Sequence, residues 1–181
     1  FNAQALIIAT LDKDTETEHF NYVMEKGERF YLKPRPYDKL RRHLIDKKEK
    51  ILINKNFEQA AAQFGLTVLP GTEYPKSMLF VPLIAGDQVK RYVSLQNIDK
   101  EDAFSESDVR LLETLANTMS VALENARLFD ETNRLLKETE QRTAELGIIN
   151  SVQEGLASKL DIQAIYDLVG DKIRDVFDTQ G

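Results

Sequence analysis

The 181-residue sequence contains no cysteine. This absence excludes disulfides, thiolate nucleophiles, thiolate metal sites and any cofactor attached through sulfur. Histidine is scarce as well: His19 and His43 are far apart, and neither belongs to a metal-ligand spacing such as H-E-x-x-H. The sequence also offers no recognisable set of nucleophile, histidine and acid. These absences favour a protein that is not an enzyme and that holds no metal.

Long hydrophobic runs and an excess of positive charge are missing too. No apolar stretch approaches the roughly 18 residues that a membrane span needs. No basic segment precedes an apolar one at the start of the chain, as it would in a signal peptide. The net charge of −6 disfavours nucleic acid as the main partner, because phosphate binding normally needs a basic excess. We therefore expect a cytoplasmic domain with neither a membrane nor a nucleic-acid partner.

The first part of the chain, to about residue 97, begins with a predicted β-hairpin. The apolar run ALIIATL is rich in β-forming residues and is followed by the polar turn DKDTETE. The next run, HFNYVMEKG, alternates between apolar and polar residues, as a half-buried strand does. We expect Phe20, Tyr22 and Met24 to lie on one face of this second strand.

A second hairpin is the clearest local signal in the sequence. SMLFVPLI is too apolar for a half-exposed strand, so both of its faces should be covered, and Gly86-Asp87 supplies the turn. The returning strand ends in VSLQN. Its alternation predicts two faces. One face should carry Val89, Val93 and Leu95, and the other Lys90, Tyr92, Ser94 and Gln96.

Two short helices are predicted between the hairpins. YDKLRRHLIDKKEK has apolar residues at helical spacing, and NFEQAAAQFG is a helix that stops at Gly65. The locally basic stretch from Leu40 to Lys50 is interpreted as a solvated helix face rather than as an anion site. A sheet with helices on at least one face follows, which indicates an α+β or α/β class.

The second part of the chain is predicted to be helical. Ser105 is the expected N-cap, with Asp108 where a capping box normally has Glu. Apolar residues then recur in alternating steps of three and four, the heptad pattern of a coiled coil. A core Asn in such a pattern lowers stability but fixes the register and the number of strands. The predicted dimer seam consists of Leu112, Leu115, Met119, Ala122, Ala126, Phe129, Asn133 and Leu136.

The heptad pattern weakens and then resumes further along. It loses phase through KETEQRTAE and returns at Leu146, after which Leu160-Asp161 is interpreted as a stop and a new N-cap. A helix of this length would span roughly 80 Å, longer than a domain of this size, so it should project. A projecting apolar stripe needs a partner, and we expect a parallel homodimer rather than packing on the chain's own sheet alone.

These residues together resemble a known family. SMLFVPLI, the hairpin into VSLQN, and F-S-E-S-D opening the helix LLETLANTMSVALENARL are similar to a GAF domain. The resemblance covers about residues 1 to 129. It implies an α+β fold: a six-stranded antiparallel sheet flanked by helices, here with a long C-terminal coiled-coil helix. It also implies a sensory role, in which a small-molecule domain signals along its C-terminal helix to an effector.

The resemblance also bears on cofactors and ligands. Members that bind cyclic nucleotides carry Asn-Lys, a later Phe, and Asp-Glu, whereas this chain has Asn97-Ile98, Phe104 and Asp108-Val109. The alternative reading of Asn97 and Asp108 is a turn residue and a helix-start carboxylate. Tetrapyrrole-binding members attach the pigment through Cys, which is absent, and haem-binding members use an axial His that has no counterpart here. The resemblance therefore implies no covalent tetrapyrrole and no haem, and it leaves any cofactor unknown.

The two ends of the chain suggest a piece of a tandem GAF array. Phe177-Asp178-Thr179-Gln180 matches Phe1-Asn2-Ala3-Gln4 in role, as a helix end that leads into a first strand. We expect a GAF domain lacking its leading helix at 1–129, a signalling helix at 105–160, and the leading helix of a following domain at 161–181. That last helix is expected to cover the open sheet face, either in the same chain or swapped from a partner.

Three functions remain open from the sequence. The first is a non-enzymatic sensory module of a signal-transduction protein, which dimerises through the helix and relays small-molecule occupancy to an effector. The second is a structural dimerisation spacer without a ligand, and the third is a cyclic-nucleotide-binding GAF domain. Expected ligand-binding residues, near the strand pair and the loop before it, are Tyr74, Ser77, Tyr92, Ser94 and Asn97.

Overall fold

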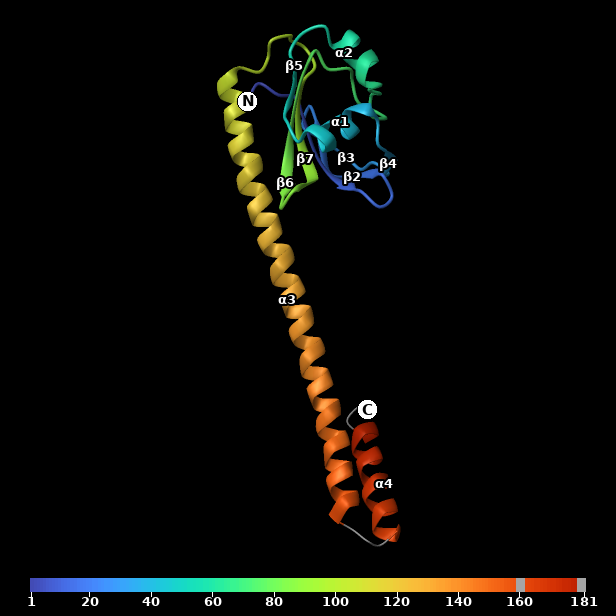
Figure 1. Ribbon diagram of the computed structural model, residues 1–181. Helices are drawn as coiled ribbons and strands as arrows, with labels where there is room; N and C mark the ends of the chain where they lie inside the picture. The colour runs from blue at the N-terminus through green and yellow to red at the C-terminus, as the bar shows by residue number, and fades with distance from the viewer. Residues whose placement is uncertain (159–161, 179–181) are drawn as a thin grey trace. The chain divides into compact units, whose positions relative to one another are not determined.

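The computed structural model describes residues 1–158 and 162–178. The chain divides into two compact units, Phe1–Asn125 and Ala126–Gly181. The first unit contains a sheet with helices on both faces, and the second is helical (Figure 1). The helix α3 (Glu106–Ser158) contributes residues to both units. Within the described residues, no helix combines the length and the apolar character needed to cross a membrane.

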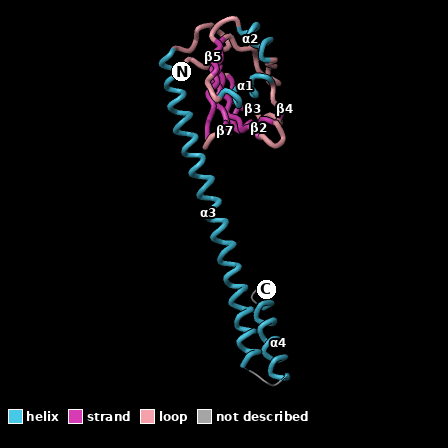
Figure 2. Tube along the Cα trace, in the orientation of Figure 1, coloured by secondary structure: helices cyan, strands magenta, loops and turns pink. Residues whose placement is uncertain are grey.

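The sheet is antiparallel throughout, and its strands run in the order β3-β2-β1-β7-β6-β5. Figure 2 shows the strands in magenta in the first unit, together with α1 and α2. One further strand, β4, pairs with β2 beside β3. The described residues thus form seven strands, one more than the resemblance implied, because the two-residue β4 adds to the main path. The strands are β1 (Ala5–Asp12), β2 (Thr17–Glu25), β3 (Glu28–Phe30), β4 (Arg35–Pro36), β5 (Ile51–Ile53), β6 (Ser77–Ala85) and β7 (Gln88–Asn97).

Two short helices cover one face of this sheet, which we call the cavity face. The helix α1 (Lys39–Lys47) begins at Asp38, whose carboxylate accepts a hydrogen bond of 2.9 Å from the Arg41 backbone N–H. The helix α2 (Phe57–Phe64) ends at Gly65, which has a positive φ of 62°. Leu40 and Leu44 of α1 are fully buried in the core on this face. Both helices and both hairpins lie where the sequence predicts them.

β-Bulges change which side chains share a face. Between β1 and β2 the register shifts after Ile8, so that Ile8 pairs with Tyr22 and Ala9 pairs with Phe20. Because directly paired residues point to the same side, Phe20 packs in the cavity-face core whereas Tyr22 does not. The prediction that Phe20 shares a face with Tyr22 and Met24 is therefore wrong.

The second hairpin contains the same kind of irregularity. The register shifts between Leu83 and Ile84, so that Leu83 pairs with Arg91 and Ile84 pairs with Val89. One extra residue on β7 places Val89 in the cavity-face core with Tyr92, not on the side of Val93 and Leu95. The predicted alternation holds from Tyr92 onward and fails at Val89.

The opposite face of the sheet, which we call the helix face, is covered by the first turns of α3. Ser105 and Asp108 form the predicted capping box: the Ser105 N–H donates to the Asp108 carboxylate at 2.9 Å, and the Asp108 N–H donates to the Ser105 hydroxyl at 3.2 Å. The residues of α3 that pack against this face recur at helical spacing. They are Val109, Leu112, Ala116, Met119 and Leu123.

The long C-terminal helix is confirmed, since α3 continues without a break through the predicted polar gap at KETEQRTAE. The helix α4 (Ile162–Asp178) follows, and it packs against the last turns of α3 within the second unit (Figure 1). A Cβ atom at Gly155 of α3 would lie 1.9 Å from a methyl carbon of Leu168, so a larger residue there would force the Leu168 side chain to move.

Within the second unit, α4 packs on the end of α3. The apolar residues Val169 and Ile173 lie against Ile148 and Val152 of α3. That the second helix covers an open sheet face, in the same chain or swapped from a partner, stays a prediction. The predicted stop and N-cap at Leu160-Asp161 lie outside the described residues.

Candidate ligand cavity

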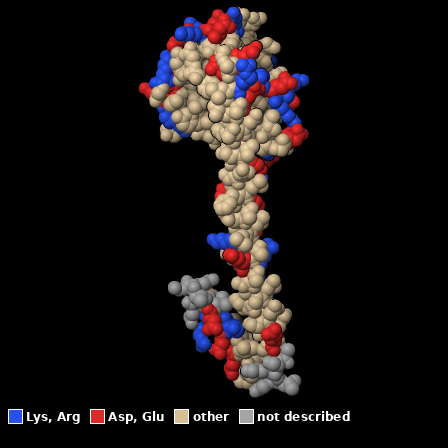
Figure 3. Space-filling model, turned by 90° about the vertical axis from the view of Figure 1, so that its left-hand side faces the viewer, with Lys and Arg blue, Asp and Glu red and all other residues tan. Residues whose placement is uncertain are grey.

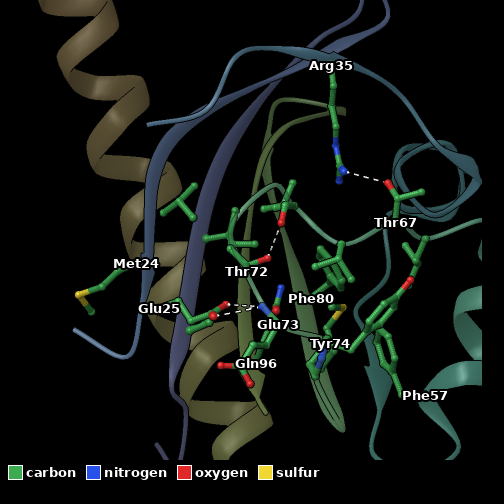
Figure 4. A pocket seen from close by; sticks show the side chains of 18 of the residues that line it. Met24, Glu25, Arg35, Phe57, Thr67, Thr72, Glu73, Tyr74, Phe80 and Gln96 are labelled. Atoms are coloured by element: carbon green, nitrogen blue, oxygen red, sulfur yellow. Dashed lines mark hydrogen bonds between the residues drawn. The ribbon is translucent and has the colours of Figure 1, made fainter. Parts of the chain in front are cut away.

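A small cavity of about 40 Å³ lies on the cavity face of the sheet (Figure 4). Its floor is formed by the start of β1, the end of β2, and neighbouring parts of β6 and β7. Its roof is the loop 65–76 between α2 and β6, together with Phe57. Apolar side chains such as Ile7, Val23, Leu69 and Phe80 form most of the wall. Pockets that hold drug-sized ligands are usually about 300–1,000 Å³, so this cavity has room for only a few water-sized groups.

Guanidinium groups close one end of the cavity. Arg41 is 3% exposed, donates from Nε to the Glu18 carboxylate at 3.0 Å, and donates from Nη1 to Asp38 at 2.8 Å. Arg35 also pairs with Glu18, and it donates to the Thr67 hydroxyl at 3.3 Å. The two positive charges are therefore matched by two carboxylates. The expectation that the basic stretch from Leu40 to Lys50 is only a solvated face is wrong at Arg41, because this side chain points into the core.

Glu18 is fully buried at the centre of this network. It accepts hydrogen bonds from both arginines and from the Tyr92 hydroxyl, which lies 2.5 Å away. Burial alone would raise the pKa of Glu18, but the charges of Arg41 and Arg35 and the bond from Tyr92 hold the pKa below its usual value. Burial raises the pKa of Tyr92, so its hydroxyl stays protonated and can donate to Glu18.

The other end of the cavity is lined by Glu25 and Gln96, which are 6% and 8% exposed. Both residues pair with Ala5 of the strand between them, so their side chains point to the same side and flank a small methyl group. The Glu25 carboxylate accepts only the Glu73 backbone N–H, at 3.2 and 3.4 Å, in the lower half of Figure 4. Burial raises the pKa of Glu25, and the nearby Glu73 charge raises it further. The hydrogen bond from the Glu73 N–H lowers the pKa but does not cancel this rise.

The described part of the chain leaves both polar groups at this end short of partners. No ion pair reaches Glu25, and no hydrogen bond to the Gln96 side-chain amide is found there. Lys26, the nearest cation, is paired with Glu73 at 2.5 Å on the surface. Among the described residues, Glu25 thus has one backbone N–H and no cation to compensate its charge, and the Gln96 amide has no side-chain hydrogen bond, which marks this end as the part of the cavity suited to a ligand.

Of the five ligand-binding residues predicted from the sequence, Tyr74 is the one that lines this cavity, at its rim against Phe57. Tyr92 lies beneath the cavity in the Glu18 network. The Ser94 hydroxyl is buried, with no hydrogen-bond partner among the described residues. The structure places Ser77 and Asn97 at the sheet end instead.

Ser77 and Asn97 hold loops together. The Ser77 hydroxyl donates to the backbone oxygen of Lys100 at 2.9 Å. The Asn97 side-chain oxygen accepts from the backbone N–H groups of Asp99 and Lys100, at 3.1 and 2.8 Å. This turn, and the capping role of Asp108, confirm the reading of Asn97 and Asp108 as turn and helix-start residues. Within the described residues, no cluster of three or more His, Asp or Glu side chains could hold a metal ion.

The cavity residues that the sequence analysis missed are Glu25, Gln96, Arg35 and Arg41. A usable signal exists for Glu25: with the bulge at Asn21 taken into account, Glu18, Phe20, Val23 and Glu25 all fall on the inward face of β2. Two carboxylates on the buried side of a strand would then stand out. Without the bulge, the alternation assigns Glu18 and Glu25 to opposite faces, which hides the pattern.

The predicted seam residues divide into two groups. Leu112 is 4% exposed and Met119 is half-buried, and both pack on the chain's own sheet. We therefore leave these two out of any seam between chains. The remaining six are largely exposed, including Leu115 at 49%, Phe129 at 68% and Leu136 at 56%. The other three are Ala122, Ala126 and Asn133.

The family of the chain follows from a direct comparison. A model of the GAF domain matches residues 1–124, so the chain belongs to the GAF domain family. No curated protein matches the chain. Solved GAF structures and related proteins share the fold at low sequence identity, and at such identities the likeness concerns the fold alone.

Three of these structures illustrate the range. The GAF domain of a two-component sensor histidine kinase from Bacillus halodurans is 21% identical with a TM-score of 0.54, over 71% of this chain and 86% of that one. A methyl-accepting chemotaxis protein is 13% identical with a TM-score of 0.57, over 70% and 81%. A type II free methionine-R-sulfoxide reductase from Thermoplasma acidophilum is 17% identical with a TM-score of 0.52, over 66% and 77%.

Proposed function

We propose that this chain is a non-enzymatic sensory module of a signalling protein, which dimerises through the exposed side of α3 and relays cavity occupancy to an effector. The occurrence of the fold in a sensor histidine kinase and a chemotaxis protein supports this proposal. The sulfoxide reductase shows that the fold also serves an enzyme. The absence of cysteine from this chain speaks against thiol-based redox chemistry.

One observation carries the proposal: the strands that floor the cavity are also the strands that hold α3. Along β6, Met78 and Phe80 line the cavity while Leu79 between them packs in the helix-face core. Along β7, Gln96 lines the cavity while Leu95 packs beside α3. Since neighbouring residues of a strand point to opposite faces, a shift of either strand on ligand binding would move the packing under α3.

The exposed residues of α3 suit a partner helix. On the side of the first unit that α3 covers, uncharged side chains occupy the centre and charged groups lie at the margins (Figure 3). From Ala122 to Leu136 the exposed seam residues are spaced by four and three residues, as in a two-stranded coiled coil. Asn133 occupies a core position of this spacing. Paired with the same residue of a second copy, it would fix a parallel register.

A test of dimerisation replaces Phe129 by Glu. The charge would be buried at the seam, so the dimer dissociation constant is expected to rise by at least 100-fold in sedimentation velocity. Gln141→Glu adds the same charge at an exposed position outside the seam and should leave the dimer intact. A monomeric parent protein at high concentration, or equal dimerisation of both variants, would contradict the proposed seam.

A structural spacer is the second candidate, and the size of the cavity favours it. At about 40 Å³ the space cannot hold a cyclic nucleotide without rearrangement of the loop 65–76, so the cyclic-nucleotide alternative finds no support in this cavity. A screen by thermal unfolding separates the two candidates. A sensor gains stability with at least one small ligand, and a spacer gains none.

A further inference from the structure

The Glu25 end of the cavity carries one unbalanced negative charge. Four charged residues line the cavity: Glu25, Glu73, Arg35 and Arg41. The two arginines are balanced by Glu18 and Asp38, and Glu73 is balanced by Lys26. Glu25 remains, buried and without an ion pair among the described residues. A ligand that completes this end should therefore be a cation.

The hydrogen-bonding groups at this end narrow the ligand further. Glu25 supplies carboxylate oxygens, and Gln96, two strands away across Ala5, supplies an amide that can present its oxygen. Strands two apart are separated by roughly 10 Å at the backbone, so side chains reaching inward from both can meet one donor-rich group between them. An ammonium group has three donors and no acceptor, which matches two acceptor side chains.

The walls determine what can be attached to the ammonium group. Most of the other lining side chains, among them Ile7, Val23 and Met78, offer no hydrogen bonds apart from the weak thioether. The volume of about 40 Å³ admits only a few non-hydrogen atoms. An alkyl chain of one to three carbons fits these walls, and a longer one would have to displace the loop 65–76.

We propose that this cavity binds the cationic head of a small primary amine, with its ammonium group paired to Glu25 and Gln96. This inference rests on the proposed sensory function and names the ligand class of that function. The amine would compete with the Glu73 backbone N–H for the same carboxylate. Because that contact ties the loop 65–76 to β2, ligand binding at Glu25 would alter how the loop is held.

The test uses the full chain and short amines as probes. Methylamine, ethylamine and propylamine, as chlorides, are compared with methanol, ethanol and propanol at equal concentration, with sodium chloride matching the ionic strength. At best, ligands of two to four non-hydrogen atoms bind with dissociation constants of about 6 mM to about 40 μM, so 50 mM probe occupies the site even for the smallest amine. The amines are expected to raise the melting temperature, and the alcohols are expected to leave it unchanged.

Two variants tie the effect to the site. Glu25→Gln should weaken amine binding by at least tenfold in isothermal titration calorimetry, because it removes the charge and keeps the shape. Glu49→Gln removes the same charge from an exposed residue that does not line the cavity, and it should bind amines as the parent does. The melting temperature of each variant without ligand shows that it folds. Equal stabilisation by alcohols, equal binding by Glu25→Gln, or no amine effect would overturn the inference and leave a cavity filled by water.

The same titration separates this inference from the proposed function. The dimer dissociation constant is measured with and without amine. If amines bind through Glu25 and the dimer dissociation constant does not change, the proposal that the ligand is an amine is upheld. The proposal that occupancy is relayed through the dimer is then contradicted. If no amine binds but Phe129→Glu still dissociates the dimer, the ligand class is wrong and the dimerising module stands.

Discussion

The two faces of the sheet in the first unit bury side chains of different chemistry. The helix face packs Leu79, Val81, Leu83, Val93 and Leu95 under α3, and its few buried polar residues, Ser77, Asn97 and Ser120, all have hydrogen-bond partners. The cavity face buries polar groups among its apolar residues. These are Glu18, Glu25, Arg41, Ser94 and Gln96.

This difference separates packing from function. Apolar burial needs only shape and volume, so the helix face is explained by its contribution to stability. Burying a charge is unfavourable unless partners compensate for it, so a buried polar group on the other face needs a reason. The burial of Glu18 is compensated by its hydrogen bonds to two arginines and Tyr92. Among the described residues, Glu25 and Gln96 have no comparable set of partners, which is why the ligand proposal rests on them.

The largest expected effect comes from breaking the network on the cavity face. Arg41→Met should lower the free energy of unfolding by about 4 kcal/mol, since it leaves buried Glu18 with one guanidinium fewer. Arg42→Met, at the next residue of α1, removes an exposed pair with Glu16 and should have little measurable effect on stability, because solvent screens that pair. Urea unfolding followed by circular dichroism measures both. Equal losses would show that the buried network is no more important than a surface pair.

A cavity in the helix face should have a somewhat smaller effect. Leu79 is fully buried, and Leu79→Ala should cost about 3 kcal/mol through lost transfer energy and incomplete collapse of the space. Leu52→Ala on β5, where the side chain is 43% exposed, is the matched control and should cost less than about 1 kcal/mol. If the two faces are separate in function, the Leu79→Ala protein binds amines as the parent does.

The smallest effect is a change of pH dependence at Glu25. Its folded pKa is raised above the unfolded value near 4.5, so the folded state binds the proton more tightly. Stability therefore falls as the pH rises from the unfolded pKa through the folded pKa, and the loss persists at higher pH. Glu25→Gln should remove this loss, so its melting temperature should exceed that of the parent at pH 7 and the difference should shrink as the pH falls toward 4.5.

Glu18 should show the opposite sign. Its folded pKa lies below the unfolded value near 4.5, so the stability it contributes is present above that pH and is lost as the pH falls through the folded pKa. Thermal unfolding between pH 3 and pH 8 distinguishes the two carboxylates. If Glu25→Gln has no advantage at pH 7, Glu25 carries no unbalanced charge, and the argument for a cationic ligand loses its basis.

The elements of the fold were predictable because their signals are local. The turn at Gly86-Asp87, the stop at Gly65 and the capping box at Ser105 each depend on residues close together in the chain, and all are found where predicted. The two bulges were not predictable. One extra residue in a strand leaves the composition unchanged but reverses every later side chain.

Most residues of the candidate site could not be predicted from the sequence either, because their positions depend on how the strands pair. Glu25 and Gln96 are 71 positions apart in the printed sequence. They line the same end of the cavity because both strands pair with Ala5 of the strand between them. For a related reason, the sequence could not show that Leu112 and Met119 pack on the chain's own sheet. One helix stripe can face its own sheet or another chain, and periodicity alone does not tell these apart.

By itself, the sequence determined the family, the order of strands and helices, and the unbroken length of α3, because each depends on neighbouring residues and on the period of the apolar positions. Only the tertiary structure decided which charges are buried, which of them are paired, and which residues of α4 pack against the end of α3. Those outcomes depend on contacts between distant segments, whose energies are set by burial and geometry rather than by residue type.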